Sequence, residues 1–390
     1  MIKLCFMLLS LTCSLTVQSQ TDSTKVNHYM AMADSLLDER YIDASIQQYK
    51  QALSMYSINK NWQKVSECLN DIGYAYHLGS NPEKAMEYVQ SSLELAIKKG
   101  GENHLVVGQN YNTLGILFMD NGYYDKASDC YKKAIKIKSH HLGPDHYEIS
   151  IMYNNMGILF HNNGDFEKAL LYYNKALSIW IDKLGKEHRN IAIGLNNIGQ
   201  VYWENGKYDL ALENHRKCLD LLKTLFEEGH IWYAGTYNNL GIVNTSIGNF
   251  DTALHYYTSA LEIRLNLLGE SHWEIANSYG NIGGLYLEMK DYEKAVEYFS
   301  KDLGIELKVF KVPHPLIAYS YGNLARTYLK MNQLTLAIDQ IQKAINGYLG
   351  NYNVNYVYIN PVIPNKNLNL DVLDALRLKG LVLEKLYEMK

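Results

Sequence analysis

Residues 153–176 have the sequence YNNMGILFHNNGDFEKALLYYNKA, and this stretch decides the fold. Tyr153, Met156 and Phe160 are large apolar residues at i, i+3 and i+7, with Gly157 itself at i+4, and this spacing predicts the buried stripe of an amphipathic helix. Gly164 is placed to end that helix in a left-handed conformation, and the aromatic Phe166 begins a second helix. Ala169 follows Gly157 by 12 residues, and two small residues so placed predict a close crossing of two antiparallel helices.

The same pattern returns every 42 residues along the chain. Glycine occupies the first-helix position six times, at Gly73, Gly115, Gly157, Gly199, Gly241 and Gly283, and Ala325 takes the seventh place. Alanine occupies the second-helix position in all seven repeats, at Ala85, Ala127, Ala169, Ala211, Ala253, Ala295 and Ala337. This regularity predicts an all-α protein built from repeated helix pairs. Aromatic side chains that fill the space around the small residues explain much of an unusual composition, 33 tyrosines against 8 phenylalanines.

A glycine followed by alanines 12 and 19 residues later, as in Gly157, Ala169 and Ala176, resembles the tetratricopeptide repeat. The usual unit has about 34 residues, so the longer period here lengthens the second helix and the link to the next repeat. The links at 142–146, 184–188 and 268–272 resemble those in the long repeats of kinesin light chains and their bacterial relatives. The resemblance implies a right-handed α-solenoid of about eight repeats with a terminal helix.

Residues 1–19 are predicted to be a signal peptide. Lys3 gives a positive start, Leu4–Val17 is apolar and uncharged, and small residues lie three and one positions before a cut ahead of Gln20. A buried N-terminal helix and lipid attachment at Cys13 are the alternatives. We expect an exported protein, periplasmic or extracellular, with no transmembrane segment after the signal peptide is removed.

The predicted repeat array spans residues 20–350, with seven repeats in strict register from about residue 69. An irregular first repeat precedes them, with Tyr41 and Ala44 placed in phase. A Tyr/Asn/Pro-rich loop follows at 351–369, and 370–390 is expected to be a capping helix or part of a truncated repeat. This C-terminal part resembles the region that precedes the CHAT domain, a caspase-like peptidase fold, in bacterial proteins.

Composition and charge exclude several classes of function. The chain is 47% hydrophobic and 20% charged, with six prolines and a net charge of −4, which argues against disordered and membrane-spanning chains. No basic surface for nucleic acid is expected. Phosphate-binding loops, nucleophile elbows and paired carboxylates are missing, so the sequence predicts neither an enzyme nor a cofactor.

Histidine and cysteine side chains are assigned structural roles. Six histidines share one position in the link, namely His104, His146, His188, His230, His272 and His314. Equivalent atoms in stacked helices lie about 10 Å apart, too far to share a metal ion, so each histidine is expected to hydrogen-bond at the start of the next helix. The cysteines after the leader, Cys68, Cys130 and Cys218, follow no metal or redox spacing, and we expect packing rather than reactive thiols.

The first helix of each repeat is expected to line a concave groove. Its recurrent asparagines are Asn70, Asn112, Asn154, Asn196 and Asn238, three residues before the glycine position, and Asn155, Asn197, Asn239, Asn281 and Asn323, two residues before it. An amide both donates and accepts hydrogen bonds, which suits an extended peptide backbone. The alternative is that these amides bond to neighbouring helices and only set the curvature.

Other groove positions vary, as expected for peptide specificity. They include Tyr74, Ile116, Ile158, Gln200 and Arg326, which follow the glycine position directly, and Trp203. Arg326 is the one cation among them, which argues against a clamp for a carboxylate terminus.

The sequence therefore predicts an exported, non-enzymatic scaffold that binds a protein or peptide segment of unknown identity. One alternative is the sensing part of a CHAT-type peptidase whose effector domain is absent from this chain. A second alternative is a self-assembling scaffold that associates through the C-terminal helix.

Overall fold

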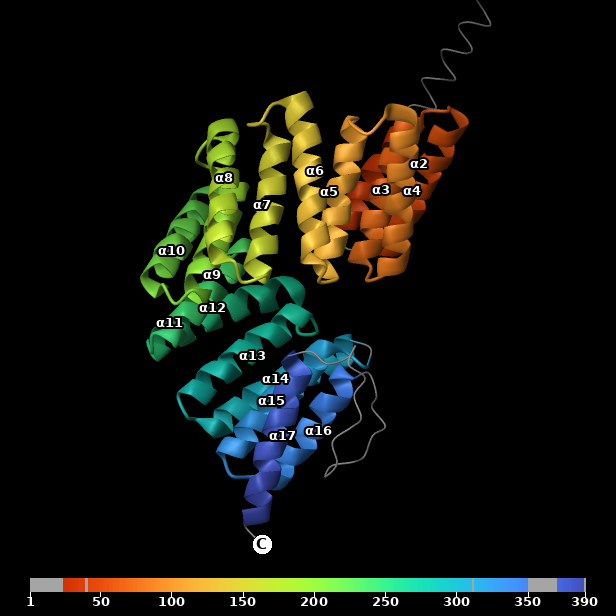
Figure 1. Cartoon of the computed structure of the whole chain (residues 1–390). Coiled ribbons are helices and arrows are strands. Elements are labelled where there is room, and N and C mark those ends of the chain that lie inside the picture. Colours follow the sequence, from red (N-terminus) through yellow and green to blue (C-terminus); the bar gives the residue numbers. More distant parts are fainter. Residues whose placement is uncertain (1–23, 39–40, 311, 350–369, 389–390) are drawn as a thin grey trace, which may run out of the picture. The chain divides into compact units, whose positions relative to one another are not determined.

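The computed structural model describes residues 24–38, 41–310, 312–349 and 370–388, and every regular element within them is a helix (Figure 1). The chain divides into two units, Met1–Lys186 (unit 1) and Glu187–Lys390 (unit 2). Each unit is an array of antiparallel helix pairs, so the all-α solenoid expected from the 42-residue period is confirmed.

Unit 1 begins with the helical residues 24–38, which pack against α2 (Ile42–Ile58). Its next pairs are α3 (Trp62–Leu78) with α4 (Pro82–Gly100), α5 (Leu105–Asp120) with α6 (Tyr124–Leu142), and α7 (Tyr147–Asn162) with α8 (Phe166–Leu184). Figure 1 shows these helices side by side from red to yellow-green.

Unit 2 continues with the same kind of pairs. They are α9 (Arg189–Glu204) with α10 (Tyr208–Leu225), α11 (Ile231–Ser246) with α12 (Phe250–Leu268), α13 (Trp273–Glu288) with α14 (Tyr292–Val309), and α15 (Pro315–Lys330) with α16 (Leu334–Tyr348). A last helix, α17 (Leu370–Glu388), packs on α16 and buries Ala375 and Val382 in the same cluster as Ile341.

In four of the pairs, a tyrosine or phenylalanine ring lies against the recurrent glycine, at Gly115, Gly157, Gly241 and Gly283. A Cβ atom added to Gly157 would lie 2.4 Å from Cδ1 of Tyr173, far inside van der Waals contact. Ala169 on the same second helix is fully buried. The sequence predicts aromatic rings around these small residues, and the ring of Tyr173 lies directly against Gly157. This contact requires a residue without a side chain.

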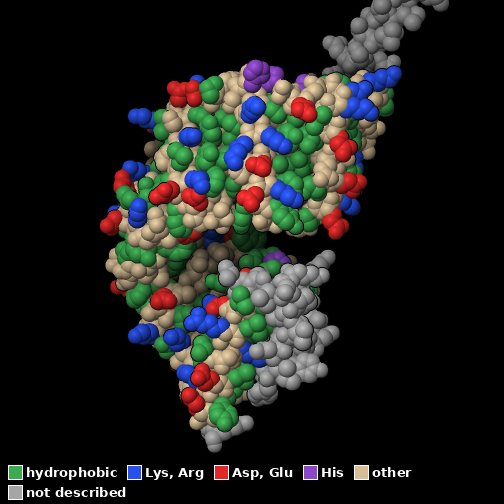
Figure 2. Space-filling model, in the orientation of Figure 1, with side chains coloured by type: hydrophobic (Ala, Val, Ile, Leu, Met, Phe, Trp, Pro, Cys, Tyr) green, Lys and Arg blue, Asp and Glu red, His purple; other side chains and the backbone are tan. Residues whose placement is uncertain are grey.

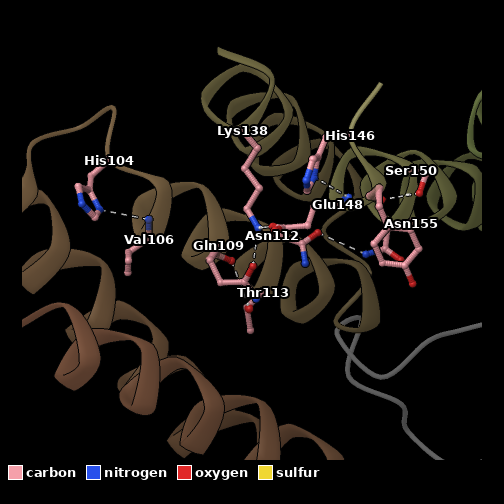
Figure 3. Close-up of polar contacts among 11 residues, drawn as sticks. His104, Val106, Gln109, Asn112, Thr113, Lys138, His146, Glu148, Ser150 and Asn155 are labelled. Carbon is pink, nitrogen blue, oxygen red and sulfur yellow. Dashed lines mark hydrogen bonds and ion pairs between the residues drawn. The ribbon is translucent and has the colours of Figure 1, made fainter. Parts of the chain in front are cut away.

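The ends of the helices follow the predicted signals. All six link histidines are N-caps, and Nδ1 of His146, for example, accepts a hydrogen bond of 3.2 Å from the backbone N–H of Glu148 (Figure 3). The prediction of a structural role for these histidines is therefore confirmed. The glycines after the first helices have positive φ angles, with +74° at Gly164, which confirms the left-handed helix ends.

The first repeat differs from the prediction by one residue. Ser45, not Ala44, takes the buried position on α2, because Ser45 is fully buried whereas Ala44 is partly exposed. The Ser45 hydroxyl donates a hydrogen bond of 2.8 Å to the carbonyl oxygen of Ala33 on the preceding helix. Two adjacent small residues made the sequence ambiguous here.

The predicted signal peptide at 1–19 and the loop at 351–369 lie outside the described residues. Among the helices that are described, none combines the length and apolar character needed to cross a membrane.

Candidate functional site

A buried cation in unit 1 is satisfied by the chain itself. Lys138 on α6 is only 4% exposed, and its Nζ atom donates a hydrogen bond of 2.7 Å to Oε1 of Gln109 (Figure 3). The same ammonium forms an ion pair with Glu148 on α7. Because a buried charge is tolerated only when it is paired, this cluster joins two repeats rather than offering a binding site.

The asparagines of successive first helices bond to one another. Nδ2 of Asn155 donates to Oδ1 of Asn112 at 3.4 Å in unit 1 (Figure 3), and Nδ2 of Asn281 donates to Oδ1 of Asn238 at 2.6 Å in unit 2. Each bond links residues 43 positions apart, so the amides connect neighbouring repeats. These contacts support the alternative in which the asparagines set the curvature, and a role in ligand binding stays a prediction.

Asn196 has a different set of partners. Its Nδ2 donates to the hydroxyl of Thr236 at 3.0 Å, and its Oδ1 lies 2.9 Å from Nδ1 of His215. His215 occupies the position of Tyr131, Tyr173 and Tyr257 in other repeats and is 1% exposed. Burial lowers the pKa of His215 to about 4, which keeps the imidazole neutral at pH 7.

A groove lies on the first helices of unit 2. A pocket of about 410 Å³ is lined by residues of α9, α11, α13 and α15, among them Trp203 and Ile242, with side chains of α12 and α14 at its base. A smaller pocket shares Trp203 and Ile242 and adds Gln200 and Asn239. We call the two pockets together the unit-2 groove.

The unit-2 groove brings together part of the predicted site. The predicted residues that line it are Gln200, Trp203, Asn239, Asn281 and Asn323. Tyr74, Asn112, Ile116, Asn154, Asn155 and Ile158 belong to unit 1 and are no part of this groove. Arg326 lies elsewhere on unit 2, where its guanidinium pairs with Asp374 of α17.

Two acidic side chains in the groove were missed by the sequence reasoning. Asp302 and Glu306 on α14 line the larger pocket, and both lie within hydrogen-bond distance of the Ser320 hydroxyl. The signal was present in the repeat pattern, because Asp302 takes a position where four other repeats have alanine. A second departure from the repeat pattern is Gly280, which stands three residues before Gly283, where earlier repeats have asparagine.

Burial governs the protonation of these acids. Desolvation, with repulsion from Glu306 second, raises the pKa of Asp302 to about 8. Burial also raises the pKa of Glu306, while the hydrogen bond from Ser320 opposes the shift. Two carboxyl groups this close and this buried do not both ionise readily at neutral pH.

Potential metal ligands and thiols are present in the described part of the chain, in the link histidines and in three cysteines. No group of three or more His, Cys, Asp or Glu side chains there is arranged to hold a metal ion. Cys68, Cys130 and Cys218 are buried and free, and burial raises the pKa of Cys130 and of Cys218 to about 11. The prediction that they are packing residues agrees with this burial.

Charge on the outer surface is mixed. Figure 2 shows lysine and arginine side chains interspersed with acidic ones over the visible face of unit 1. This face therefore presents no extended area of a single sign.

Comparison with known proteins places the repeats in a family. A tetratricopeptide repeat profile matches residues 106–182, 148–224, 190–266, 232–305 and 274–349, more than half of the chain together. No curated protein sequence matches the chain.

Solved structures with similar folds differ widely in their own roles. The STAND signal-transduction ATPase with a tetratricopeptide repeat sensor from Pyrococcus horikoshii aligns with a TM-score of 0.57 at 17% identity, over 82% of this chain and 46% of that one. Aspartyl phosphate phosphatase F from Bacillus subtilis aligns with a TM-score of 0.55 at 16% identity, over 76% of this chain and 74% of that one. Nearly identical TPR-like repeats from a kinesin light chain candidate of Podosopora anserina align with a TM-score of 0.44 at 18% identity, over 52% of this chain and 95% of that one. At such identities the likeness concerns the fold alone.

Proposed function

The chain belongs to the tetratricopeptide repeat family, and from this premise we propose that it is a scaffold that binds an extended segment of a partner protein in the unit-2 groove. The repeat fold supports a role in protein–protein interaction. A peptide ligand, its place in the groove and the absence of enzymatic activity are our proposals.

The single observation that carries this proposal is the composition of the groove. The side-chain amides of Asn239, Asn277 and Asn281 lie along the same groove as the apolar surfaces of Trp203 and Ile242. Amides can pair with the N–H and C=O groups of an extended backbone, and apolar surfaces can receive its side chains. In peptide recognition, hydrogen bonds to the backbone give affinity and pockets for side chains give specificity, and this groove offers both kinds of contact.

Site-specific photo-crosslinking tests the proposal. A photoreactive phenylalanine analogue at Gln200 or at Asn277, both exposed in the groove, should capture a partner from a cell-envelope extract. The same group at Lys217, an exposed position on α10 outside the groove, is the control. Crosslinks of equal yield at all three positions, or at Lys217 alone, would contradict binding in the groove.

Export is a second proposal, which rests on Lys3 and the apolar run Leu4–Val17. When the full-length chain is expressed, we expect to recover outside the cytoplasm a shortened protein that begins at Gln20. N-terminal sequencing of the protein from each cell fraction measures this. Recovery with Met1 retained would contradict it. The likeness to repeats that precede CHAT domains stays a prediction from the sequence.

Self-association is a further proposal, because α17 exposes apolar side chains. Leu373 and Leu381 are each nearly half exposed, and Tyr387 is largely exposed. Light scattering of the purified chain over a range of concentrations tests this, and a constant monomer mass would contradict it.

A further inference from the structure

The base of the unit-2 groove holds more hydrogen-bond acceptors than donors, even when one of its two carboxyl groups is protonated. The Ser320 hydroxyl lies 3.0 Å from Oδ2 of Asp302 and 2.8 Å from Oε2 of Glu306, yet a hydroxyl has one proton and can donate to only one of them. Oδ1 of Asp302 is buried and has no hydrogen-bond partner among the described residues. Asp302 itself is 4% exposed. We call this cluster of Asp302, Glu306 and Ser320 the acidic recess.

The acidic recess replaces a pattern that is apolar elsewhere. The position of Asp302 is alanine in other second helices, at Ala134, Ala176, Ala260 and Ala344. On the facing helix, Gly280 stands where Asn196 and Asn238 stand in earlier repeats. A Cβ atom at Gly280 would lie 2.9 Å from Oδ2 of Asp302, so the glycine makes room for the carboxylate. The two departures from the pattern therefore depend on each other.

In the preceding repeat, the equivalent serine is bonded to a guanidinium group. Arg264 is 7% exposed, its Nη1 donates to the Ser278 hydroxyl at 2.6 Å, and its Nε donates to Oε2 of Glu274 at 3.2 Å. Ser278 and Ser320 are equivalent residues, 42 positions apart. In the next repeat, however, the position of Arg264 is taken by Glu306. The serine is kept, and the cation is replaced by a second acid.

We propose that the acidic recess binds the guanidinium group of an arginine side chain in the peptide that occupies the unit-2 groove. This inference rests on the proposed function. A guanidinium has several donors and no acceptor, so it can serve both carboxylates and the unpaired Oδ1 at once. No lysine or arginine of the described chain lines the groove to take this place.

The walls of the pocket suit the same ligand group. Trp273 and Tyr319 line it and are 46% and 54% exposed, so both aromatic side chains are accessible, and a guanidinium plane can stack on an aromatic ring. Burial makes ionisation of Asp302 costly in the empty pocket, as its raised pKa indicates. An incoming cation offsets that cost.

Titration of two short peptides into the full chain tests the proposal. The probes are acetyl-Gly-Gly-Arg-Gly-Gly-amide and the same peptide with citrulline, which keeps the shape of arginine and lacks its charge. We expect the citrulline peptide to bind roughly tenfold more weakly or worse, because it loses charge-assisted hydrogen bonds. Asp302→Ala should weaken the binding of the arginine peptide by a similar factor.

The variants are chosen so that folding does not decide the result. Asp302→Ala introduces the residue that other repeats have at this position, and Asp302→Asn removes the charge at nearly constant shape. Asp220→Ala removes a carboxylate that is 77% exposed on α10, outside the groove, and should leave binding unchanged. Circular dichroism checks that each variant is folded.

The possible failures separate the two proposals. Equal binding of the arginine and citrulline peptides would overturn the arginine proposal and leave groove binding intact. The arginine proposal would also be wrong if its peptide did not bind although photo-crosslinks at Gln200 and Asn277 captured a partner. If the arginine peptide did not bind and the photo-crosslinks captured no partner, both proposals would be overturned. A Ca²⁺-induced rise in melting temperature that Asp302→Ala abolishes would assign the recess to a metal instead.

Discussion

At the scale of single residues, the contact between a glycine and an aromatic ring sets what a position tolerates. Gly157→Ala would place a methyl group 2.4 Å from the ring of Tyr173, so the ring or the helix must move. Overpacking of this kind costs about 1–3 kcal/mol of unfolding free energy. Urea unfolding followed by circular dichroism measures the loss.

The same substitution at Gly304 is the control. Nothing lies within 4 Å of a Cβ atom placed there, and Gly304 is inside α14. Gly304→Ala should therefore gain the helix propensity of alanine, up to about 1 kcal/mol. If Gly157→Ala were equally stabilising, the assigned contact with Tyr173 would be wrong.

His215 makes the stability of unit 2 depend on pH. Its pKa falls from 6.5 to about 4 on folding. Between these two pH values the imidazole is protonated in the unfolded chain and neutral in the native chain. The neutral imidazole of His215 therefore contributes fully to the free energy of unfolding above pH 6.5, and this contribution is lost as the pH falls towards 4. The free energy of unfolding should fall by about 2 kcal/mol between pH 7 and pH 5.

His215→Tyr restores the residue that three other repeats have and should remove this part of the pH dependence. The measurement is the unfolding free energy of parent and variant at pH 5 and pH 7. A parent and a variant that lose stability equally on acidification would show that His215 is not buried in its neutral form.

At the scale of the helix, a side chain on the left-handed residue that follows a first helix lowers the stability of the fold. Lys290 has a φ angle of +63° at the position where Gly248 has +79° one repeat earlier. A side chain in this backbone conformation lowers the free energy of unfolding by about 1–2 kcal/mol relative to glycine. Lys290→Gly should therefore raise the melting temperature.

Gly248→Lys is the reciprocal change and should lower the melting temperature by a comparable amount. Since nothing lies within 4 Å of a Cβ atom at Gly248, the loss would come from the backbone and not from a steric clash. Changes of the same sign in the two variants would contradict this explanation.

The sequence predicted the helices well because their signals are local. Gly164 and His146 mark helix ends through their own backbone conformation or a hydrogen bond two residues away. The offset between Ala44 and Ser45 could not be resolved, since both residues are small and lie side by side.

The candidate site was less predictable because it depends on packing between helices. Asp302 lies on a second helix, and only the glycine at position 280 opposite admits its carboxylate to the groove. The asparagine pattern leaves both ligand binding and a structural role open for Asn196, and its contact with His215 depends on which residue the second helix presents. Periodicity within one helix does not contain this information.

At the scale of the whole molecule, contacts stay between near neighbours along the chain. Every substantial contact among the described helices joins helices at most two apart in sequence order. Damage to one pair should therefore remain local. Ala169→Tyr, at a fully buried position of α8, should remove hydrogen-exchange protection from α7 and α8 while α3 and α4 keep theirs.

Leu171→Tyr is the matched control on the same helix. Leu171 is 52% exposed, so a tyrosine there meets solvent and protection should be unchanged. Uniform loss of protection throughout unit 1 in Ala169→Tyr would show that its pairs unfold as one cooperative block.

Contacts restricted to near neighbours also have a kinetic consequence. The chain need not close long loops before its contacts form, so the entropy of loop closure opposes folding only weakly. Folding can then start at any helix pair and extend outward one repeat at a time. Duplication of a 42-residue segment would lengthen such a chain with little effect on its folding rate, which gives evolution a simple way to extend the groove.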